Sequence, residues 1–283
     1  MPPGSQYKTI EDYLYALERR QELEKAPTAA VFMLGSWDMM MLEIAGHPWL
    51  TRVRCELPTR PLGPSGEEDP IKATFVGGNN KDDADEYKQF VAAMALIDVT
   101  RCCHLKITEQ DPSHRALAHL EQSDIVVLGD GPHVQKAWWN MNEASNCALV
   151  DRIKWRYYCG AVLIGVGTGA MLLGLRWWVG NPQQELDARV KGFQPRADEQ
   201  KEAERLYWGG TDYFGAKATE IVPAFFTTDF EQGASFATLQ GAIAASIVLP
   251  RLGAAIFNID GTLEPCNAIL YEHVWNWKRE EVC

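Results

Sequence analysis

One segment near the middle of the chain combines an apolar run with a cluster of glycines. Residues 161–174 read Ala-Val-Leu-Ile-Gly-Val-Gly-Thr-Gly-Ala-Met-Leu-Leu-Gly. This pattern predicts a buried strand, a tight turn and the start of a helix that pack closely together. It is the layout of a nucleophile elbow, in which a sharp strand-to-helix turn holds a reactive side chain over the edge of a sheet. The position that would carry Ser or Cys in such an elbow is Gly167.

A glycine at this position preserves the turn but provides no nucleophilic side chain. The strained backbone of an elbow costs a non-glycine residue about 1–3 kcal/mol and costs glycine almost nothing. The same pattern also fits a strand–helix joint, or a phosphate-binding loop, that never carried a nucleophile. Spacing alone leaves both interpretations open.

Segments with strand character alternate with segments of helix character along the chain. The expected strands are 29–36, 71–76, 99–107, 124–128, 161–166, 220–226, 254–260 and 268–272. The expected helices include 81–96, 113–122, 148–158 and an alanine-rich segment at 234–249. Alternation at this spacing predicts an α/β fold with a mostly parallel sheet and helices on both faces.

We expect a single α/β domain at 29–283, preceded by a helical extension at 1–28. A length of 283 residues is sufficient for one large core or two modest ones. The extension opens on an acidic amphipathic helix rather than an apolar signal sequence. A polar, charge-rich insertion is expected at about 180–218.

The composition disfavours several classes of function. A formal net charge of −11 argues against nucleic acid as a partner, because binding the phosphate backbone needs clustered Lys and Arg. The seven cysteines include no C-x-x-C pair, a pattern that suits an intracellular reducing compartment, either cytoplasm or an organelle without a recognisable cleavable presequence. We expect no metal site, even at 102–104 (Cys-Cys-His), because neighbouring residues of a strand point to opposite faces. No cofactor is expected either.

Two uncharged stretches, 157–175 and 232–250, approach the length of a membrane span. Both are dense in Gly, Ala or polar residues and fit buried core segments. We therefore expect a chain that does not span a membrane.

Glycine-bearing turns are expected at one edge of the sheet, where the carboxyl ends of parallel strands meet. These turns lie at Gly77, Gly129 and Gly165. Their backbone amides form a candidate cradle for a small anionic ligand. The residues predicted to contribute to it are Gly77, Gly78, Gly129, Asp130, Gly131, Gly167 and Thr168.

The order of the segments resembles the cyanophycinase and dipeptidase E family of serine peptidases. Residues 165–170, Gly-Val-Gly-Thr-Gly-Ala, stand where members carry Gly-x-Ser-Ala-Gly-Ala, and 129–131, Gly-Asp-Gly, stand at the family's Gly-Gly turn. The resemblance spans roughly residues 29–272. It implies a class I glutamine amidotransferase-like fold, which is a three-layer flavodoxin-like architecture.

The resemblance also implies that two catalytic positions are empty. The serine that attacks the substrate carbonyl corresponds to Gly167, and the histidine of the family's Asp-x-His-Phe segment corresponds to Asp229. Serine–histidine catalysis loses several orders of magnitude in rate when either partner is removed. We therefore expect no catalytic residue, and the resemblance implies a pseudoenzyme.

Thr168, His133 and Cys159 are the candidates for a rearranged active site. Thr168 follows the nucleophile position, but its expected role is to cap the next helix. His133 begins a helix beside the crevice, and Cys159 ends a helix, where a buried structural thiol is usual. Asp130 and Asp260 follow strands and are expected to be turn residues bonded to local amides.

These observations favour a non-catalytic protein that uses a hydrolase fold as a structural or interaction subunit. We expect protein partners, either in a multi-subunit assembly or as a homodimer. Ten tryptophans provide a side chain that is enriched at interface anchors. Two alternatives stay open. The first is a hydrolase, peptidase or amidase with a rearranged active site, and the second is a module that binds a small anion.

Overall fold

The computed structural model describes the central part of the chain and its carboxyl-terminal strands. The described residues are 29–41, 49–57, 70–77, 83–107, 113–131, 137, 141, 149–174, 176–177, 216–217, 219, 221–222, 225–227 and 245–272. The extension at 1–28 and most of the insertion at 180–218 lie outside them, as do Gly78, His133 and Asp229. The division into domains therefore stays a prediction.

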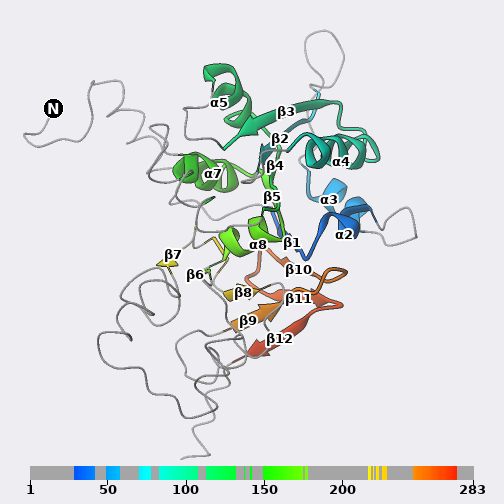
Figure 1. The fold of residues 1–283 in the computed structure, drawn as a ribbon, viewed down its shortest axis with the longest axis vertical. Helices are drawn as coiled ribbons and strands as arrows, with labels where there is room; N and C mark the ends of the chain where they lie inside the picture. Colours follow the sequence, from blue (N-terminus) through cyan, green and yellow to red (C-terminus); the bar gives the residue numbers. More distant parts are fainter. Residues whose placement is uncertain are drawn as a thin grey trace, which may run out of the picture.

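The main sheet has seven strands, most of them parallel (Figure 1). The parallel neighbours are β1 (Val31–Leu34), β5 (Val162–Val166), β4 (Ile125–Leu128), β2 (Lys72–Gly77) and β3 (Arg101–Lys106). Two antiparallel strands extend the sheet beyond β1, namely β10 (Ala254–Phe257) and β11 (Leu263–Cys266). The spatial order is β11-β10-β1-β5-β4-β2-β3. The mostly parallel sheet expected from the sequence is confirmed.

Helices cover both faces of this sheet (Figure 1). On one face lie α2 (Trp37–Met41), α3 (Trp49–Glu56) and α4 (Asp83–Ala95). On the other lie α5 (His114–Leu120), α7 (Leu149–Tyr158) and α8 (Thr168–Leu173). The predicted arrangement of helices on both faces is therefore confirmed.

The central strands are apolar along their whole length because both of their faces are covered. Every residue of β1, β4 and β5 is buried. Successive residues of β1 point to opposite faces: Val31 and Met33 belong to the cluster under α5, α7 and α8, whereas Phe32 and Leu34 belong to the cluster under α2, α3 and α4. A continuous apolar run thus fills two separate cores.

A second sheet of five strands was not predicted from the sequence. Its members are β6 (Arg176–Trp177), β7 (Ala216–Lys217), β8 (Phe225–Thr227), β9 (Ala245–Val248) and β12 (Ile269–Glu272). Their spatial order is β12-β9-β8-β6-β7. The strand expected at 268–272 exists, but it pairs with β9 in this second sheet instead of joining the main one.

The alanine-rich helix expected at 234–249 is wrong over residues 245–248, which form β9. This strand ends in Ile247 and Val248, whose branched side chains suit a pleated surface, and it lies between β8 and β12. Pairing on both sides outweighs the local helix propensity of the alanines. Strand β11 was also missed, because it contains Pro265, which an edge strand tolerates.

Within the described part of the chain, no helix is long and apolar enough to cross a lipid bilayer.

Glycines let the start of α8 approach the ends of β4 and β5. A Cβ atom on Gly165 would lie 2.6 Å from the Cα of Ala170. A Cβ atom on Gly169 would lie 2.2 Å from the carbonyl oxygen of Leu128. Both distances are far shorter than a real contact, so any side chain at these positions displaces backbone.

We predict that Gly169→Ala lowers the free energy of unfolding by roughly 3 kcal/mol, because its methyl group meets a backbone carbonyl that cannot move aside. Gly261→Ala is the matched control: Gly261 has φ of +85° but open space around it, so only backbone strain of about 1 kcal/mol is expected. Urea denaturation of both variants measures the difference. Equal losses would contradict the close approach of α8 to β4.

Candidate functional site

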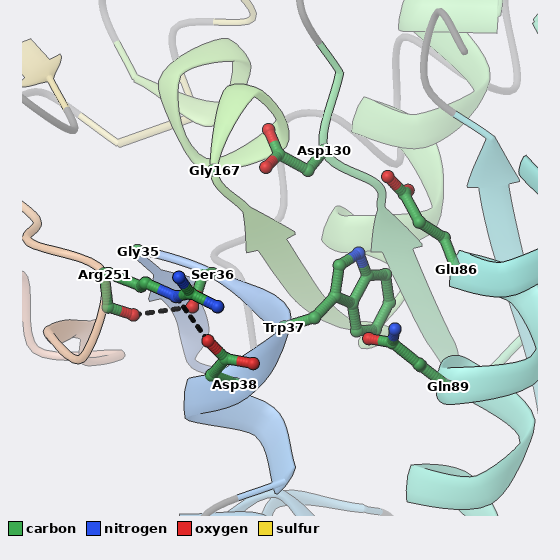
Figure 2. A pocket seen from close by; sticks show the side chains of 9 residues that line it. All are labelled: Gly35, Ser36, Trp37, Asp38, Glu86, Gln89, Asp130, Gly167 and Arg251. Atoms are coloured by element: carbon green, nitrogen blue, oxygen red, sulfur yellow. Dashed lines mark hydrogen bonds and ion pairs between the residues drawn. The ribbon is translucent and has the colours of Figure 1, made fainter.

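A pocket of about 500 Å³ opens at the carboxyl ends of β1, β4 and β5 (Figure 2). It is lined by Gly35, Ser36, Trp37, Asp38, Glu86, Gln89, Asp130, Gly167 and Arg251. Parallel sheets place their ligand crevices at this edge. The pocket therefore lies on the side of the sheet where the glycine-bearing turns are expected.

Gly167 forms the turn between β5 and α8. Its φ of +51° and ψ of −113° place it in a conformation that side chains rarely adopt. Its N–H donates to the carbonyl oxygen of Leu34 at 2.8 Å, and its own carbonyl accepts from the N–H of Ala170 at 3.1 Å. The strand, sharp turn and helix of an elbow are all present, without a side chain at the apex.

The carboxylate of Asp130 occupies the space beside this apex (Figure 2). A Cβ atom on Gly167 would lie 2.3 Å from Oδ1 of Asp130 and 2.4 Å from its Cγ. Oδ1 accepts hydrogen bonds from the backbone N–H groups of Thr168 at 2.9 Å and Gly131 at 2.8 Å. Asp130 thus fills the volume that an elbow side chain at residue 167 would need.

One of the two amides that bind Asp130, that of Thr168, stands where an elbow provides an oxyanion donor. In hydrolases with this turn, the N–H of the residue after the nucleophile is one donor of the oxyanion hole. That residue is Thr168 here. The donors of the predicted anion cradle at Thr168 and Gly131 therefore already hold a carboxylate from the chain itself.

The Thr168 side chain does not cap α8, contrary to the sequence-based expectation. The N-cap position is Gly167, which lacks a capping side chain, and Thr168 is the first helical residue. Its Oγ1 donates instead to the carbonyl oxygen of Gly131 at 2.5 Å. The buried hydroxyl therefore ties α8 to the turn after β4, and Thr168 does not line the pocket.

Gly77 and Gly129, which were also predicted to form the cradle, do not line the pocket, and Gly78 lies outside the described residues. The N–H of Gly129 donates to the carbonyl of Val76 at 3.0 Å, so this N–H is used in a hydrogen bond between the ends of β4 and β2. Gly77 is the last residue of β2. Of the described residues that were predicted to bind a ligand, Asp130 and Gly167 line the pocket.

Trp37, at the start of α2, forms the wall opposite Asp130 and Gly167 (Figure 2). Its side chain is only 7% exposed and packs on Phe75, with ring centroids 5.7 Å apart. Within the described structure its indole nitrogen has no hydrogen-bond partner. Figure 2 shows this nitrogen directed toward the gap between Asp130 and Glu86. A buried donor without an acceptor costs about 1–3 kcal/mol.

Carboxylates dominate the charge of the lining. Among the described lining residues, the charged side chains are the carboxylates of Asp38, Glu86 and Asp130 and the guanidinium of Arg251. Arg251 forms an ion pair with Asp38, and its backbone carbonyl accepts a hydrogen bond from Ser36 Oγ at 2.6 Å. The guanidinium of Arg251 is therefore held at the side of the pocket that carries Ser36 and Asp38.

Sequence reasoning missed most of these wall residues. Trp37 and Asp38 follow directly after an expected strand. Because the ends of parallel strands border the crevice, their place in the sequence could have indicated that they line the pocket. Glu86 and Gln89 lie one turn apart on α4. Their contribution depends on how α4 sits on the sheet, which no local pattern indicates.

None of the described cysteine and histidine side chains lines the pocket. Cys159 stands between α7 and β5, at the opposite end of β5 from Gly167. Burial raises the pKa of the Cys102 thiol to about 11, so this thiol stays protonated at neutral pH. His119 contacts Thr74 Oγ1 at 3.0 Å, and burial lowers its pKa.

Asp260 is a turn residue, as expected. It accepts hydrogen bonds from the N–H of Thr262 at 3.0 Å and from its hydroxyl at 2.6 Å. These bonds, led by the one from the hydroxyl, lower the pKa of Asp260. Among the described residues, no group of three or more His, Cys, Asp or Glu side chains is arranged to hold a metal ion.

Comparison with solved structures places this fold beside those of peptidases. The chain is similar to a peptidase from an acI-B1 Actinobacterium, with a TM-score of 0.50, 12% identity, and coverage of 88% of this chain and 89% of the other. It is also similar to a protein of Listeria monocytogenes EGD-e provisionally named a peptidase E, with a TM-score of 0.47, 11% identity, and coverage of 86% and 98%. No protein-family model and no curated protein matches the chain. At these identities the likeness concerns the α/β fold alone.

We predict that Gly167→Ser destabilises the protein by about 3 kcal/mol or more, through backbone strain and collision with Asp130. Asp130→Ala removes the collision but leaves two amides without an acceptor. The double variant is therefore expected to be about 1–2 kcal/mol more stable than the sum of the single effects. Urea denaturation of all four proteins measures this coupling.

Asp260→Ala provides the control, because Asp260 lies in a separate exposed turn. Its effect is expected to add to that of Gly167→Ser without coupling. Simple additivity between residues 130 and 167 would show that the carboxylate does not compete with an elbow side chain.

Proposed function

We propose that this chain is a non-catalytic protein built on a peptidase-like α/β fold. The observation that carries the proposal is the position of Asp130, whose carboxylate lies beside Gly167 and binds the amides of Thr168 and Gly131. The protein would act as a binding or interaction subunit rather than as a hydrolase.

Acyl transfer needs both a nucleophile and donors that stabilise the developing oxyanion. Loss of one oxyanion donor alone typically lowers kcat by about 10²–10³. Here a carboxylate already accepts from both donors, and its negative charge would repel a developing oxyanion. The absence of a side chain at Gly167 and the occupation of these amides therefore support the same conclusion.

The alternative is a hydrolase with a rearranged active site, which the likeness of the fold to a peptidase leaves open. The Thr168 hydroxyl is bonded to a backbone carbonyl, and Cys159 lies at the far end of β5. Neither residue supports this alternative. His133 and Asp229 lie outside the described residues. The binding of a small anion, the third possibility, would require Asp130 to leave the same amides.

We expect that neither the wild-type protein nor Asp130→Ala hydrolyses aspartyl peptides, because removing the carboxylate frees the amides but supplies no nucleophile. A fluorophosphonate probe and an alkylating probe for thiols, followed by mass spectrometry, are expected to leave residues 129–131 and 167–168 unmodified. An active serine peptidase in the same assay serves as the positive control.

Turnover by the wild-type protein, or a covalent adduct on any pocket residue, would contradict the proposal. Turnover that disappears in Asp130→Ala would identify Asp130 itself as catalytic. Activity in both proteins would instead place the chemistry on another residue.

We also propose that the protein acts with protein partners, as a homodimer or in a larger assembly. The support is the number of tryptophans, ten in 283 residues, since this side chain is enriched at interface anchors. Native mass spectrometry of the protein isolated from its source cells is expected to give a mass above that of one chain. A mass of a single chain under these conditions would contradict this part of the proposal.

A further inference from the structure

His119, near the end of α5, has one ring nitrogen fixed by a buried hydrogen-bond network. We propose that its other ring nitrogen, Nε2, accepts a phosphoryl group from a small donor with a good leaving group, either a phosphoramidate or an acyl phosphate. The site is separate from the pocket beside Gly167. Ser123, a member of the network, precedes β4, whereas Asp130 follows it, so the two sites lie at opposite ends of this strand. The inference therefore goes beyond the proposed function and does not rest on it.

Three short contacts connect His119 to two hydroxyl groups. Oγ of Ser123 donates to the backbone carbonyl of His119 at 2.9 Å. Oγ1 of Thr74 lies 2.7 Å from Oγ of Ser123 and 3.0 Å from Nδ1 of His119. Thr74 and Ser123 are both fully buried. Because buried polar groups form hydrogen bonds, each of these three contacts is expected to contain a hydrogen.

Counting the hydrogens fixes the tautomer of His119. A hydroxyl group has one hydrogen to donate, and a carbonyl has none. The hydrogen of Ser123 is used in the bond to the carbonyl, so the hydrogen of Thr74 must fill the contact between the two hydroxyls. The contact between Thr74 and Nδ1 then requires a hydrogen on Nδ1. Oγ of Ser123 also lies 3.4 Å from Nδ1, which agrees with an N–H at this position.

This assignment places the lone pair of the neutral ring on Nε2. The hydrogen bond that one ring nitrogen makes determines which nitrogen is free to react. Nδ1 donates to Thr74 whether the ring is neutral or charged, so the orientation of the ring is the same in both states. A new bond to the ring of His119 therefore forms at Nε2.

Three cations surround this ring, each from a different element. Lys72 lies two residues before Thr74 on β2 and on the same face of the sheet, and Arg101 is its register partner on β3. Arg115 lies one helical turn before His119 on α5. Burial, followed by the charges of these three residues, lowers the pKa of His119. The ring is therefore neutral at pH 7, and the lone pair of Nε2 is available.

The same charges select the kind of group that Nε2 accepts. They oppose the approach of a metal cation or of any positively charged reagent. A phosphoryl group is negatively charged and has three acceptor oxygens, which arginine and lysine bind through charge-assisted hydrogen bonds. The side chain of His119 is partly exposed, so a small donor has access to it. A neutral nucleophile beside three cations thus favours phosphoryl transfer.

The proposed step balances without an additional reactant. The lone pair of Nε2 attacks the phosphorus atom of phosphoramidate, and a new N–P bond forms while the N–P bond of the donor breaks. The donor reacts as its zwitterion, so ammonia leaves with the electron pair of the broken bond and needs no further proton. His119 keeps its hydrogen on Nδ1 and becomes a cationic ring that carries a dianionic phosphoryl group. With an acyl phosphate, the carboxylate leaves with the electron pair instead.

Reaction of the folded wild-type protein with potassium phosphoramidate at mildly alkaline pH tests the proposal. Peptide mass spectrometry identifies the modified histidine, and phosphorus NMR distinguishes a product on Nε2 from one on Nδ1. His114 is the internal control, because it lies on the same helix and is more exposed. We expect His119 to react at Nε2 about tenfold faster than His114, since the three cations raise the local concentration of the anionic donor. A parallel reaction with acetyl phosphate shows which class of donor reacts faster.

Variants test the role of the cations and of the network. Arg115→Gln is expected to slow the reaction of His119 about threefold, the size of effect typical of one exposed charge. Arg54→Gln removes the same charge from an exposed position on α3 and is expected to leave the rate unchanged. Thr74→Val removes the acceptor of the Nδ1 hydrogen and is expected to give product on both ring nitrogens.

The comparison of His119 with His114 uses the wild-type protein, so it decides the question even where a variant fails to fold. A product on Nδ1 of His119 would overturn the tautomer assignment and the inference with it. Reaction of His114 as fast as that of His119, or no reaction of His119 with either donor, would also overturn the inference. None of these results changes the standing of the non-catalytic proposal, because the two sites are separate.

Discussion

The hydrogen bonds from Thr168 and Gly131 to the carboxylate of Asp130 determine the chemistry of the whole site. The first amides of any helix lack partners within the helix, and a carboxylate at this end is favourable. Asp130 provides that carboxylate for α8. The same contact occupies the N–H groups of Thr168 and Gly131 and places a carboxylate at the pocket. One interaction thus has two effects: it stabilises the start of α8, and it places a carboxylate in the site.

The parallel topology brings the rest of the wall to this interaction. Trp37 follows β1, Asp130 follows β4 and Gly167 follows β5, so residues far apart in the chain meet at one edge of the sheet. Helix α4 contributes Glu86 from the face that it covers. The tight packing of Phe75 against Trp37 fixes the indole at the side of the pocket. A sheet with this order builds a concave site whether or not the site performs catalysis.

Periodicity and glycine content were sufficient to predict the parallel strands of the main sheet and the turn at Gly167, because both depend on patterns within a few residues. They failed where partners distant in sequence decide the outcome. Residues 245–248 become a strand since β8 and β12 pair with them on either side. The hydroxyl of Thr168 bonds to the carbonyl of Gly131 instead of capping α8, because Gly167 holds the N-cap position and Thr168 is the first helical residue. The orientation of Trp37 likewise follows from packing on Phe75.

The crowding between Gly167 and Asp130 limits what a single substitution can introduce at the bend. A hydroxyl-bearing residue at position 167 would place its Cβ atom 2.3 Å from Oδ1 of Asp130. A side chain at position 167 would therefore require Asp130 to be replaced as well. As long as an acidic residue stands beside this bend, its apex can hold only glycine.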